Sequence, residues 1–251
     1  MNKPYLCPLV KCLCQHKSKT KKYKFMKITY YGHSCFEIVV NGKKLLFDPF
    51  ITPNELAKAV DISKIMPDYI LLSHGHADHI ADCIAIAKQS GATVVGNYEV
   101  VSWLRKQGLK NGHEMNVGGK WMCDFGKVKC VAAVHSSSMP DGTYGGVAMG
   151  FIIESSEGNF YYAGDTALTY DMKLIGEFRQ LNFAFLPIGD NFTMGIDNAV
   201  ICSKFIKCDK LVGMHYDSFP PIKIDHEEAL SKFRDAGKEL ILMKIGASVE
   251  L

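Results

Sequence analysis

The segment Ser73-His74-Gly75-His76-Ala77-Asp78-His79 carries the strongest signal in this sequence of 251 residues. It follows an apolar stretch at 69–73 that predicts a short buried strand. It also opens a stretch at 77–89 whose apolar residues recur with helical spacing. Three histidines and one aspartate within six residues gain little from packing, and protonated imidazoles this close together repel one another. They are readily explained as metal ligands, because zinc binds imidazole nitrogens and carboxylate oxygens at about 2.0–2.2 Å.

The spacing within this segment divides its side chains between two positions. His74 and His76 lie two residues apart in an extended turn, so both side chains can approach one ion. Asp78 and His79 fall at the start of the predicted helix and can approach a neighbouring ion. The segment therefore predicts a metal centre at the carboxyl end of a strand.

Strand and helix signals extend from this segment in both directions. Asn41-Gly42 predicts a tight hairpin, and a second hairpin connection is predicted at 155–158. The chain begins with hairpins and continues with alternating strands and helices, and this order occurs twice. It predicts two sheets packed together with helices outside, an α/β layered sandwich in one domain. The predicted strands are 27–31, 36–40, 44–47, 69–73, 93–95, 115–123, 127–134, 147–154, 159–163, 183–188, 211–214 and 240–244, and the predicted helices are 77–89, 99–106, 172–179, 198–205 and 227–236.

Composition and charge separate a short basic extension from the main domain. Hydrophobic residues make up 47% of the chain and charged residues 22%, as in soluble globular proteins. No stretch approaches the roughly 20 apolar residues that span a bilayer, so no membrane partner is expected. Residues 1–25 carry seven of the 29 basic residues and none of the 26 acidic ones, which leaves 26–251 with a net charge of −4. We predict a flexible basic extension at 1–25, a domain at 26–251 and no nucleic-acid partner.

The nine cysteines indicate a reducing compartment. Most stand singly within predicted strands and helices, which favours free thiols over a disulfide framework and predicts a cytoplasmic protein. The extension contains a cluster of thiols and one imidazole: Cys7, Cys12, Cys14 and His16. These side chains could bind a soft metal ion, but their spacing fits no zinc module.

Beyond the motif itself, residues 26–251 resemble the metallo-β-lactamase superfamily. The pattern His-x-His-x-Asp-His follows a strand in that superfamily, and four further positions have candidates here in the right order: Asp48, His135, Asp165 and His215. The resemblance implies a four-layer αββα sandwich. Three shorter matches, Gly32-His33-Ser34, Pro187-Ile188-Gly189-Asp190 and His215-Tyr216, resemble a bacterial and archaeal family of metal-dependent hydrolases close to the ascorbate-6-phosphate lactonase branch.

The resemblance implies two divalent metal ions. His74, His76 and His135 would hold the first ion, and Asp78, His79 and His215 the second, with Asp165 bridging both. Zinc is the expected metal, with manganese, iron and nickel as alternatives. The implied reaction is attack of a metal-bound hydroxide on an ester, lactone or amide bond of a small molecule.

Other residues are expected to support this chemistry. Asp78 would orient the hydroxide and assist proton transfer. His33 would act as a substrate contact or acid, unless it is a surface turn residue. Asp48 would accept a ligand histidine N–H, unless it only shapes a turn. Tyr216 would stabilise an oxyanion, while His113 and His226 are predicted as surface residues without partners. Strand-end capping explains the remaining pocket candidates almost as well: Ser136, Asp190, Asn191 and Thr193.

Rival functions on the same site remain open. A metal-dependent phosphodiesterase or nuclease is the first alternative, although the acidic domain lacks the basic arm or inserted domain of such nucleases. Glyoxalase-type thiolester hydrolysis is disfavoured because little chain follows His215. A flavodiiron-type redox role would need a carboxylate in place of His76 and a flavin domain. The sequence does not predict an oligomeric state.

Overall fold

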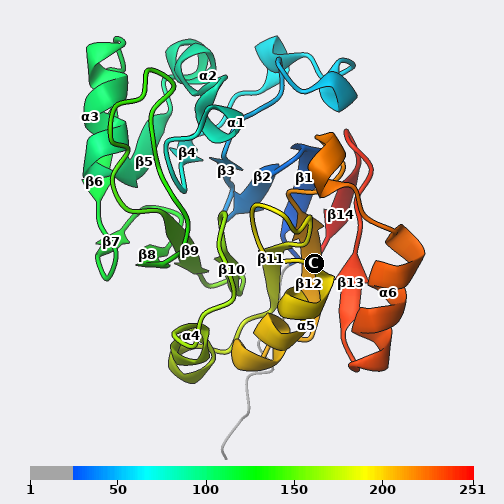
Figure 1. Cartoon of the computed structure of the whole chain (residues 1–251). Helices are drawn as coiled ribbons and strands as arrows, with labels where there is room; N and C mark the ends of the chain where they lie inside the picture. Colours follow the sequence, from blue (N-terminus) through cyan, green and yellow to red (C-terminus); the bar gives the residue numbers. More distant parts are fainter. Residues whose placement is uncertain (1–24) are drawn as a thin grey trace, which may run out of the picture.

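Two seven-stranded sheets form the centre of the structure, a computed structural model that describes residues 25–251. The predictions for the basic extension and its cysteine and histidine group lie outside these residues. The first sheet has the order β14-β1-β2-β3-β4-β5-β6 and the second β13-β12-β11-β10-β9-β8-β7 (Figure 1). In chain order the strands are β1 Lys27–Gly32, β2 Cys35–Val40, β3 Lys43–Phe47, β4 Tyr69–Leu71, β5 Thr93–Asn97, β6 Gly112–Met115, β7 Lys120–Met122, β8 Lys127–Ala132, β9 Met149–Glu154, β10 Asn159–Tyr162, β11 Phe183–Pro187, β12 Lys210–Met214, β13 Glu239–Ile241 and β14 Ser248–Glu250.

Each sheet repeats the same change from antiparallel to parallel pairing. In the first sheet β1, β2 and β3 pair antiparallel, and β3 to β6 continue in parallel. In the second sheet β7 to β10 pair antiparallel, and β10 to β13 are parallel. Parallel neighbours end at the same edge of a sheet, so the loops that follow them gather there.

Helices cover the outer faces of both sheets (Figure 1). On the first sheet these are α1 Ala77–Ile80, α2 Cys83–Ser90 and α3 Tyr98–Lys106, and on the second α4 Met172–Phe178, α5 Ile196–Phe205 and α6 His226–Asp235. The predicted four-layer α/β sandwich is thereby confirmed. Short 3₁₀ turns lie in the connections at Glu55–Ala57, Ile62–Lys64 and Pro220–Ile222. Within residues 25–251, every helix is too short or too polar to cross a bilayer.

Aromatic side chains fill the space between the sheets. The Phe36 ring lies 4.7 Å from that of Phe185, and the Phe47 ring stacks 4.5 Å from that of Tyr162. All four side chains are fully buried, and each pair joins one strand of the first sheet to one of the second. Burying such a ring stabilises the fold by about 1.5–3 kcal/mol. This packing fixes the two sheets, and so the loops at their shared edge, against each other.

The helix predicted at 77–89 is interrupted in the structure. It ends at Ile80 and resumes at Cys83, because the Asp82 carboxylate accepts hydrogen bonds from the backbone N–H groups of Ile51, at 2.7 Å, and Thr52, at 2.9 Å. Asp82 thus ties the loop after β3 to the start of α2.

The strand predicted at 115–123 is wrong as a single element. β6 ends at Met115 and β7 begins at Lys120, and the two belong to different sheets. Between them Gly118 takes a positive φ of 86°, and the Gly119 N–H bonds to the Asn116 carbonyl at 2.9 Å. The chain passes from the first sheet to the second at this turn. The short edge strand β14 was not predicted.

Candidate metal centre

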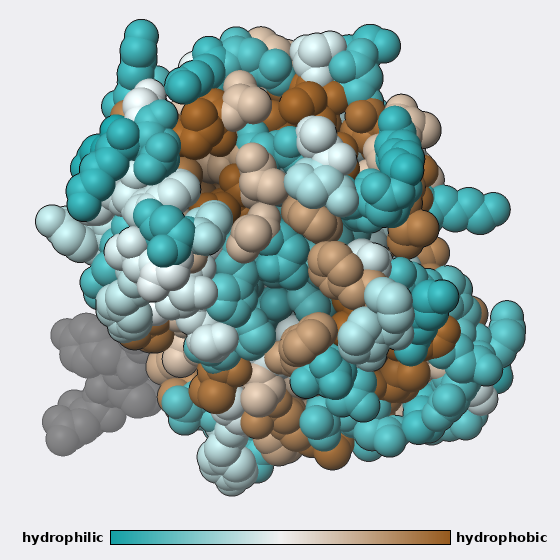
Figure 2. Space-filling view, turned by 45° about the horizontal axis from the view of Figure 1, so that its top comes forward, coloured by the Kyte–Doolittle hydropathy of each residue, from teal (hydrophilic) through white to brown (hydrophobic). Residues whose placement is uncertain are grey.

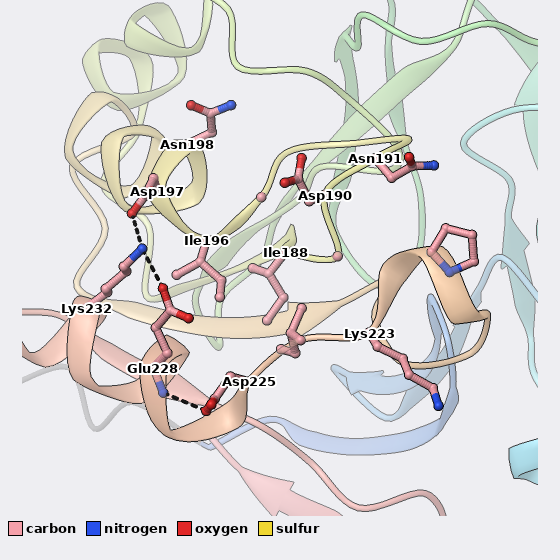
Figure 3. Close-up of a pocket in the computed structure, with 14 residues that line it drawn as sticks. Ile188, Asp190, Asn191, Ile196, Asp197, Asn198, Lys223, Asp225, Glu228 and Lys232 are labelled. Carbon is pink, nitrogen blue, oxygen red and sulfur yellow. Dashed lines mark hydrogen bonds and ion pairs between the residues drawn. The ribbon is translucent and has the colours of Figure 1, made fainter.

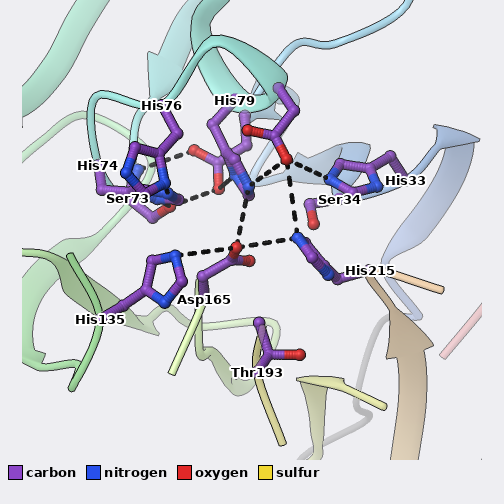
Figure 4. Close-up of polar contacts among 12 residues, drawn as sticks. His33, Ser34, Ser73, His74, His76, His79, His135, Asp165, Thr193 and His215 are labelled. Atoms are coloured by element: carbon purple, nitrogen blue, oxygen red, sulfur yellow. Dashed lines mark hydrogen bonds and ion pairs between the residues drawn. The ribbon is translucent and has the colours of Figure 1, made fainter. Parts of the chain in front are cut away.

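Six loops at strand ends bring the candidate residues together. His33, Asp48 and the segment from Ser73 follow β1, β3 and β4, and His135, Asp165 and His215 follow β8, β10 and β12. Both sheets therefore contribute to one cluster at their shared edge (Figure 4). Figure 2 turns this edge toward the viewer and shows a hollow with a hydrophilic floor and hydrophobic residues around it.

The first group consists of His74, His76 and His135. One ring nitrogen from each lies within 4.8 Å of the others. The His74 Nε2 atom is 2.9 Å from His76 Nδ1, and the His135 ring centre is about 5 Å from both other rings. His74 is buried, whereas His76 and His135 are partly exposed. Three imidazoles converge here, two of them partly exposed, and this group could hold a metal ion.

The second group consists of Asp78, His79, His215 and also His33. The Asp78 Oδ2 atom is 3.8 Å from His79 Nε2, 3.8 Å from His215 Nε2 and 3.2 Å from His33 Nε2. Ligand atoms on one zinc ion are separated by roughly 3.3–3.6 Å, since each bond is about 2.0–2.2 Å. The three histidines are buried, whereas the Asp78 side chain is 27% exposed.

Asp165 lies between the two groups. Its Oδ2 atom is 2.9 Å from His215 Nε2, 3.3 Å from His79 Nε2 and 3.6 Å from His135 Nε2. His215 and His79 belong to the second group and His135 to the first, as Figure 4 shows. One carboxylate therefore faces nitrogens of both groups, which is the arrangement that a bridging ligand requires.

Asp48 holds one histidine of the cluster from behind. Its Oδ2 atom accepts hydrogen bonds from His79 Nδ1 at 3.0 Å, from the Ser73 hydroxyl at 2.6 Å and from the Tyr162 hydroxyl at 2.8 Å. Its Oδ1 atom accepts from the Ser73 backbone N–H at 2.7 Å. The structure thus contains the expected hydrogen bond from a cluster histidine, and this bond fixes the His79 tautomer with its lone pair on Nε2.

Unpaired polar atoms in the cluster fit a cation. Within the described residues, His79 Nε2 and Asp165 Oδ1 are buried and make no hydrogen bond. In neutral His79 the Nε2 lone pair faces the Asp165 carboxylate at 3.3 Å, so a proton or a metal cation between the two atoms removes their repulsion. Buried polar atoms without partners are costly, so this donor set is the kind that a metal ion satisfies.

The electrostatics of the cluster support the same conclusion. Burial opposes the charged form of His79, yet Asp165, Asp78 and Asp48 hold its pKa well above the usual range. Burial likewise opposes the charged form of His215, and Asp165 nevertheless raises its pKa to about 9. In the first group, burial and the neighbouring His79 hold the pKa of His74 well below its usual value. The carboxylates therefore favour positive charge at His79 and His215.

Two ligand loops contact each other through strained backbone. His33 and His215 both take positive φ values, 56° and 55°, which cost about 1–3 kcal/mol each for residues other than glycine. The His215 N–H donates to the His33 carbonyl at 3.0 Å. A Cβ atom on Gly189 would overlap the carbonyl oxygen of His215. The glycine therefore permits the close approach that places His215.

Gly189→Ala is expected to displace His215. The new methyl group must push the His215 backbone away, so we expect a loss of about 1–3 kcal/mol in unfolding free energy and weaker binding of one metal ion. Urea denaturation and metal titration measure the two effects. Gly237→Ala is the control, because Gly237 has a φ of 72° but no atom within 4 Å of the added Cβ. Equal metal binding by both variants would contradict the packing argument.

The loop from Ser136 to Val147 lies beside the first group and is anchored by Asn97. The Asn97 side-chain N–H₂ donates to the carbonyls of Gly145 at 2.7 Å and Val147 at 3.1 Å. Its side-chain oxygen accepts from the Val100 N–H at 2.8 Å and caps α3. One buried amide therefore holds both a helix start and the loop beside His135.

Asn97→Ala is expected to lower the unfolding free energy by about 2–3 kcal/mol, because the cap contributes about 1 kcal/mol and each loop hydrogen bond about 1 kcal/mol. Asp225→Ala is the matched control, since Asp225 caps α6 through Glu228 N at 3.0 Å. It should lose about 1 kcal/mol. Chemical denaturation compares the two, and equal losses would show that the loop contacts contribute nothing.

The other expected residues divide between a separate cavity and the neighbourhood of the cluster. Asp190 and Asn191 line a separate cavity of about 790 Å³ between the loop after β11 and the starts of α5 and α6, and no cluster residue lines it (Figure 3). Ser136 approaches the cluster, with its hydroxyl 3.5 Å from His76 Nε2. The Thr193 hydroxyl donates to the Met194 carbonyl at 3.3 Å, and the Tyr216 ring is buried.

The predictions for two further histidines are wrong in one respect, since both have partners. His226 Nε2 is 2.7 Å from Asp217 Oδ2, and the His113 ring stacks 3.8 Å from that of Trp121. Sequence reasoning missed Ser73 and Tyr162 as partners of Asp48, and Ser218 as a partner of His33. Ser73 directly precedes the motif, so its position could have suggested a contact with the site. Nothing in the sequence links Tyr162 or Ser218 to this site.

Comparisons with known proteins agree with this geometry. Residues 43–216 match the family model of the β-lactamase superfamily domain, which is more than half of the chain. The chain belongs to the metallo-β-lactamase superfamily. It is 55% identical to a UPF0173 metal-dependent hydrolase of Flavobacterium johnsoniae and 52% identical to one of Methylacidiphilum infernorum. Each match covers 90% of this chain and the whole relative, so the chain is a member of this group of metallo-β-lactamase-fold hydrolases.

Solved structures show the same metallo-β-lactamase fold. Igni18, a metallo hydrolase of Ignicoccus hospitalis, superposes with a TM-score of 0.82 at 33% identity, over 90% of this chain and 98% of Igni18. An isothiocyanate hydrolase from Delia radicum gut bacteria superposes with a TM-score of 0.72 at 17% identity, over 89% of this chain and 98% of that one. The second likeness concerns the fold alone.

Proposed function

We propose that this protein is a dinuclear metal-dependent hydrolase that cleaves an ester, lactone or amide bond in a small molecule. The main support for this proposal is that two groups of candidate ligands both face Asp165. His74, His76 and His135 form the first group, and Asp78, His79 and His215 the core of the second. Membership of the family supports a metal-dependent hydrolase. The presence of two neighbouring ligand groups supports two metal ions.

The chain's own residues divide the work at this site. Divalent ions held by the two groups would lower the pKa of water towards about 7 and polarise the oxygen of the bond under attack. Asp165 faces nitrogens of both groups and would serve as a ligand to either ion. Asp78 adjoins the nitrogens of the second group and presents a carboxylate that holds a proton in transit to the leaving group. The Asp48 contact fixes the ring of His79.

Zinc is the metal that we propose, because the combined groups offer five imidazoles and two carboxylates. Manganese, iron and nickel accept the same donors. His76 and His135 of the first group are partly exposed, and a small-molecule substrate would approach the site on that side. Residues 26–251 carry a net charge of −4, which disfavours a nucleic-acid substrate.

A small panel of substrates tests this function. Purified protein loaded with zinc or manganese is assayed on lactones, esters, amides and a nitrophenyl phosphodiester, with Asp165→Asn as the blank. We expect turnover of a lactone, ester or amide above the blank. Turnover of the phosphodiester alone would replace the proposal with a phosphodiesterase. No metal-dependent turnover of any of these substrates would count against the proposal.

A further inference from the structure

His33 is fully enclosed beside the second ligand group. Its side chain is 1% exposed, and its ring centre lies 4.2 Å from that of His215 and 5.5 Å from that of His79. One of its ring nitrogens lies within 4.8 Å of the ligand atoms of the other three residues of that group. Neither the superfamily motif nor the ligands named under the proposed function include His33.

The surroundings of the ring allow two tautomers. His33 Nδ1 is 3.0 Å from the Ser218 hydroxyl, and that hydroxyl lies 3.3 Å from the Tyr216 carbonyl. When Ser218 donates to Nδ1, the Nε2–H group donates to the Asp78 carboxylate at 3.2 Å. When Ser218 donates to Tyr216, Nδ1 donates to Ser218 and the Nε2 lone pair faces Asp78. The second tautomer presents a nitrogen lone pair and a carboxylate to one cation.

We propose that His33 is a metal ligand of the second group, which it completes as three imidazoles and one carboxylate. This inference rests on the proposed dinuclear centre. With the shared Asp165 counted for both groups, the second group offers five candidate ligands and the first offers four. An ion in the second group would therefore have fewer coordination positions left for water or substrate. Catalytic metal sites keep a coordination position open, and closed sites hold their metal structurally.

The two groups would consequently differ in how they hold an ion. His74, His76 and His135 would leave a position for water or a substrate oxygen, and His33, Asp78, His79 and His215 would hold an ion more tightly. Ser218 acts as a positioning residue, since its hydroxyl orients the His33 ring. Hydrogen-bond partners of ligand histidines contribute about 10–100-fold to metal affinity.

Metal release measures this difference without any substrate. Zinc-loaded protein is mixed with a chromophoric chelator, and the release of each zinc ion is followed in time. The wild type should release one ion fast and one slowly, from a content of two ions per chain. His33→Ala should keep one ion per chain after desalting, and Ser218→Ala should keep two but release the slow ion about 10–100-fold faster.

Matched controls separate the possible outcomes. His226→Ala removes a half-exposed histidine that borders the same small cavity as His33, and it should release zinc as the wild type does. Two ions with unchanged slow release in both His33→Ala and Ser218→Ala would overturn the assignment of His33. A wild type that binds fewer than two ions would instead overturn the dinuclear centre. If His33→Ala fails to fold by circular dichroism, Ser218→Ala decides alone.

Discussion

Asp165→Asn is expected to reduce the metal content from two ions per chain to one or fewer and to lower kcat/KM by more than about 100-fold. The Asp165 Oδ2 atom is the only group described here that lies within 3.6 Å of nitrogens from both ligand groups. An amide removes the negative charge that offsets repulsion between two cations. Losing a mere hydrogen-bond partner of a ligand already costs about 10–100-fold, so losing a shared ligand should exceed that range.

Metal analysis after desalting and a single-substrate assay check this prediction together. Asp209→Asn is the control, because its side chain is 85% exposed and pairs only with Lys238 among the described residues. Circular dichroism verifies that both variants fold. Two retained ions with full activity in Asp165→Asn would contradict the bridging role.

Asp48→Asn is expected to lower the unfolding free energy by about 3–5 kcal/mol and the affinity for one metal ion by about 10–100-fold. The carboxylate accepts four hydrogen bonds in a fully buried position, and an amide cannot accept all of them. One donor is then left without a partner and the His79 ring loses its orientation. Asparagine tolerates the positive φ of 40° at this position, so backbone strain does not explain the loss.

Urea denaturation and zinc titration measure these two effects. Asp68→Asn is the matched control, since Asp68 also accepts a backbone hydrogen bond, from Lys44 at 2.9 Å, and forms an ion pair with Lys43. Its side chain is 38% exposed, so solvent replaces what is lost and the change should stay below about 1 kcal/mol. If Asp48→Asn loses no more than this control, the account of Asp48 is wrong.

The sequence predicted the elements whose local signals are strong. Alternating apolar residues predicted β2, and the Asn41-Gly42 pair predicted its hairpin to β3, because both signals depend on neighbours in the chain. The break at Asp82 and the sheet change at Gly118 depend on distant partners. The Asp82 carboxylate accepts hydrogen bonds from the backbone of Ile51 and Thr52. The spacing of apolar residues in the sequence gives no sign of this interaction.

The cluster was predictable as a set of residues but not as an arrangement. His74, His76, Asp78 and His79 form a local motif, whereas His135, Asp165 and His215 were placed by resemblance. The structure brings all seven together, yet their metal assignment stays a proposal. The contacts of Asp48 with Tyr162 and of His33 with Ser218 join residues more than 100 positions apart. Such contacts arise from the packing of one sheet on the other.

A zinc-edge anomalous diffraction map of zinc-loaded crystals tests the central claim, a dinuclear centre, most directly. It should show two peaks about 3.5–4 Å apart at this cluster. One peak should lie among His74, His76 and His135, and the other among Asp78, His79 and His215, with Asp165 between them. A single peak in fully loaded crystals, or peaks away from these residues, would contradict the account.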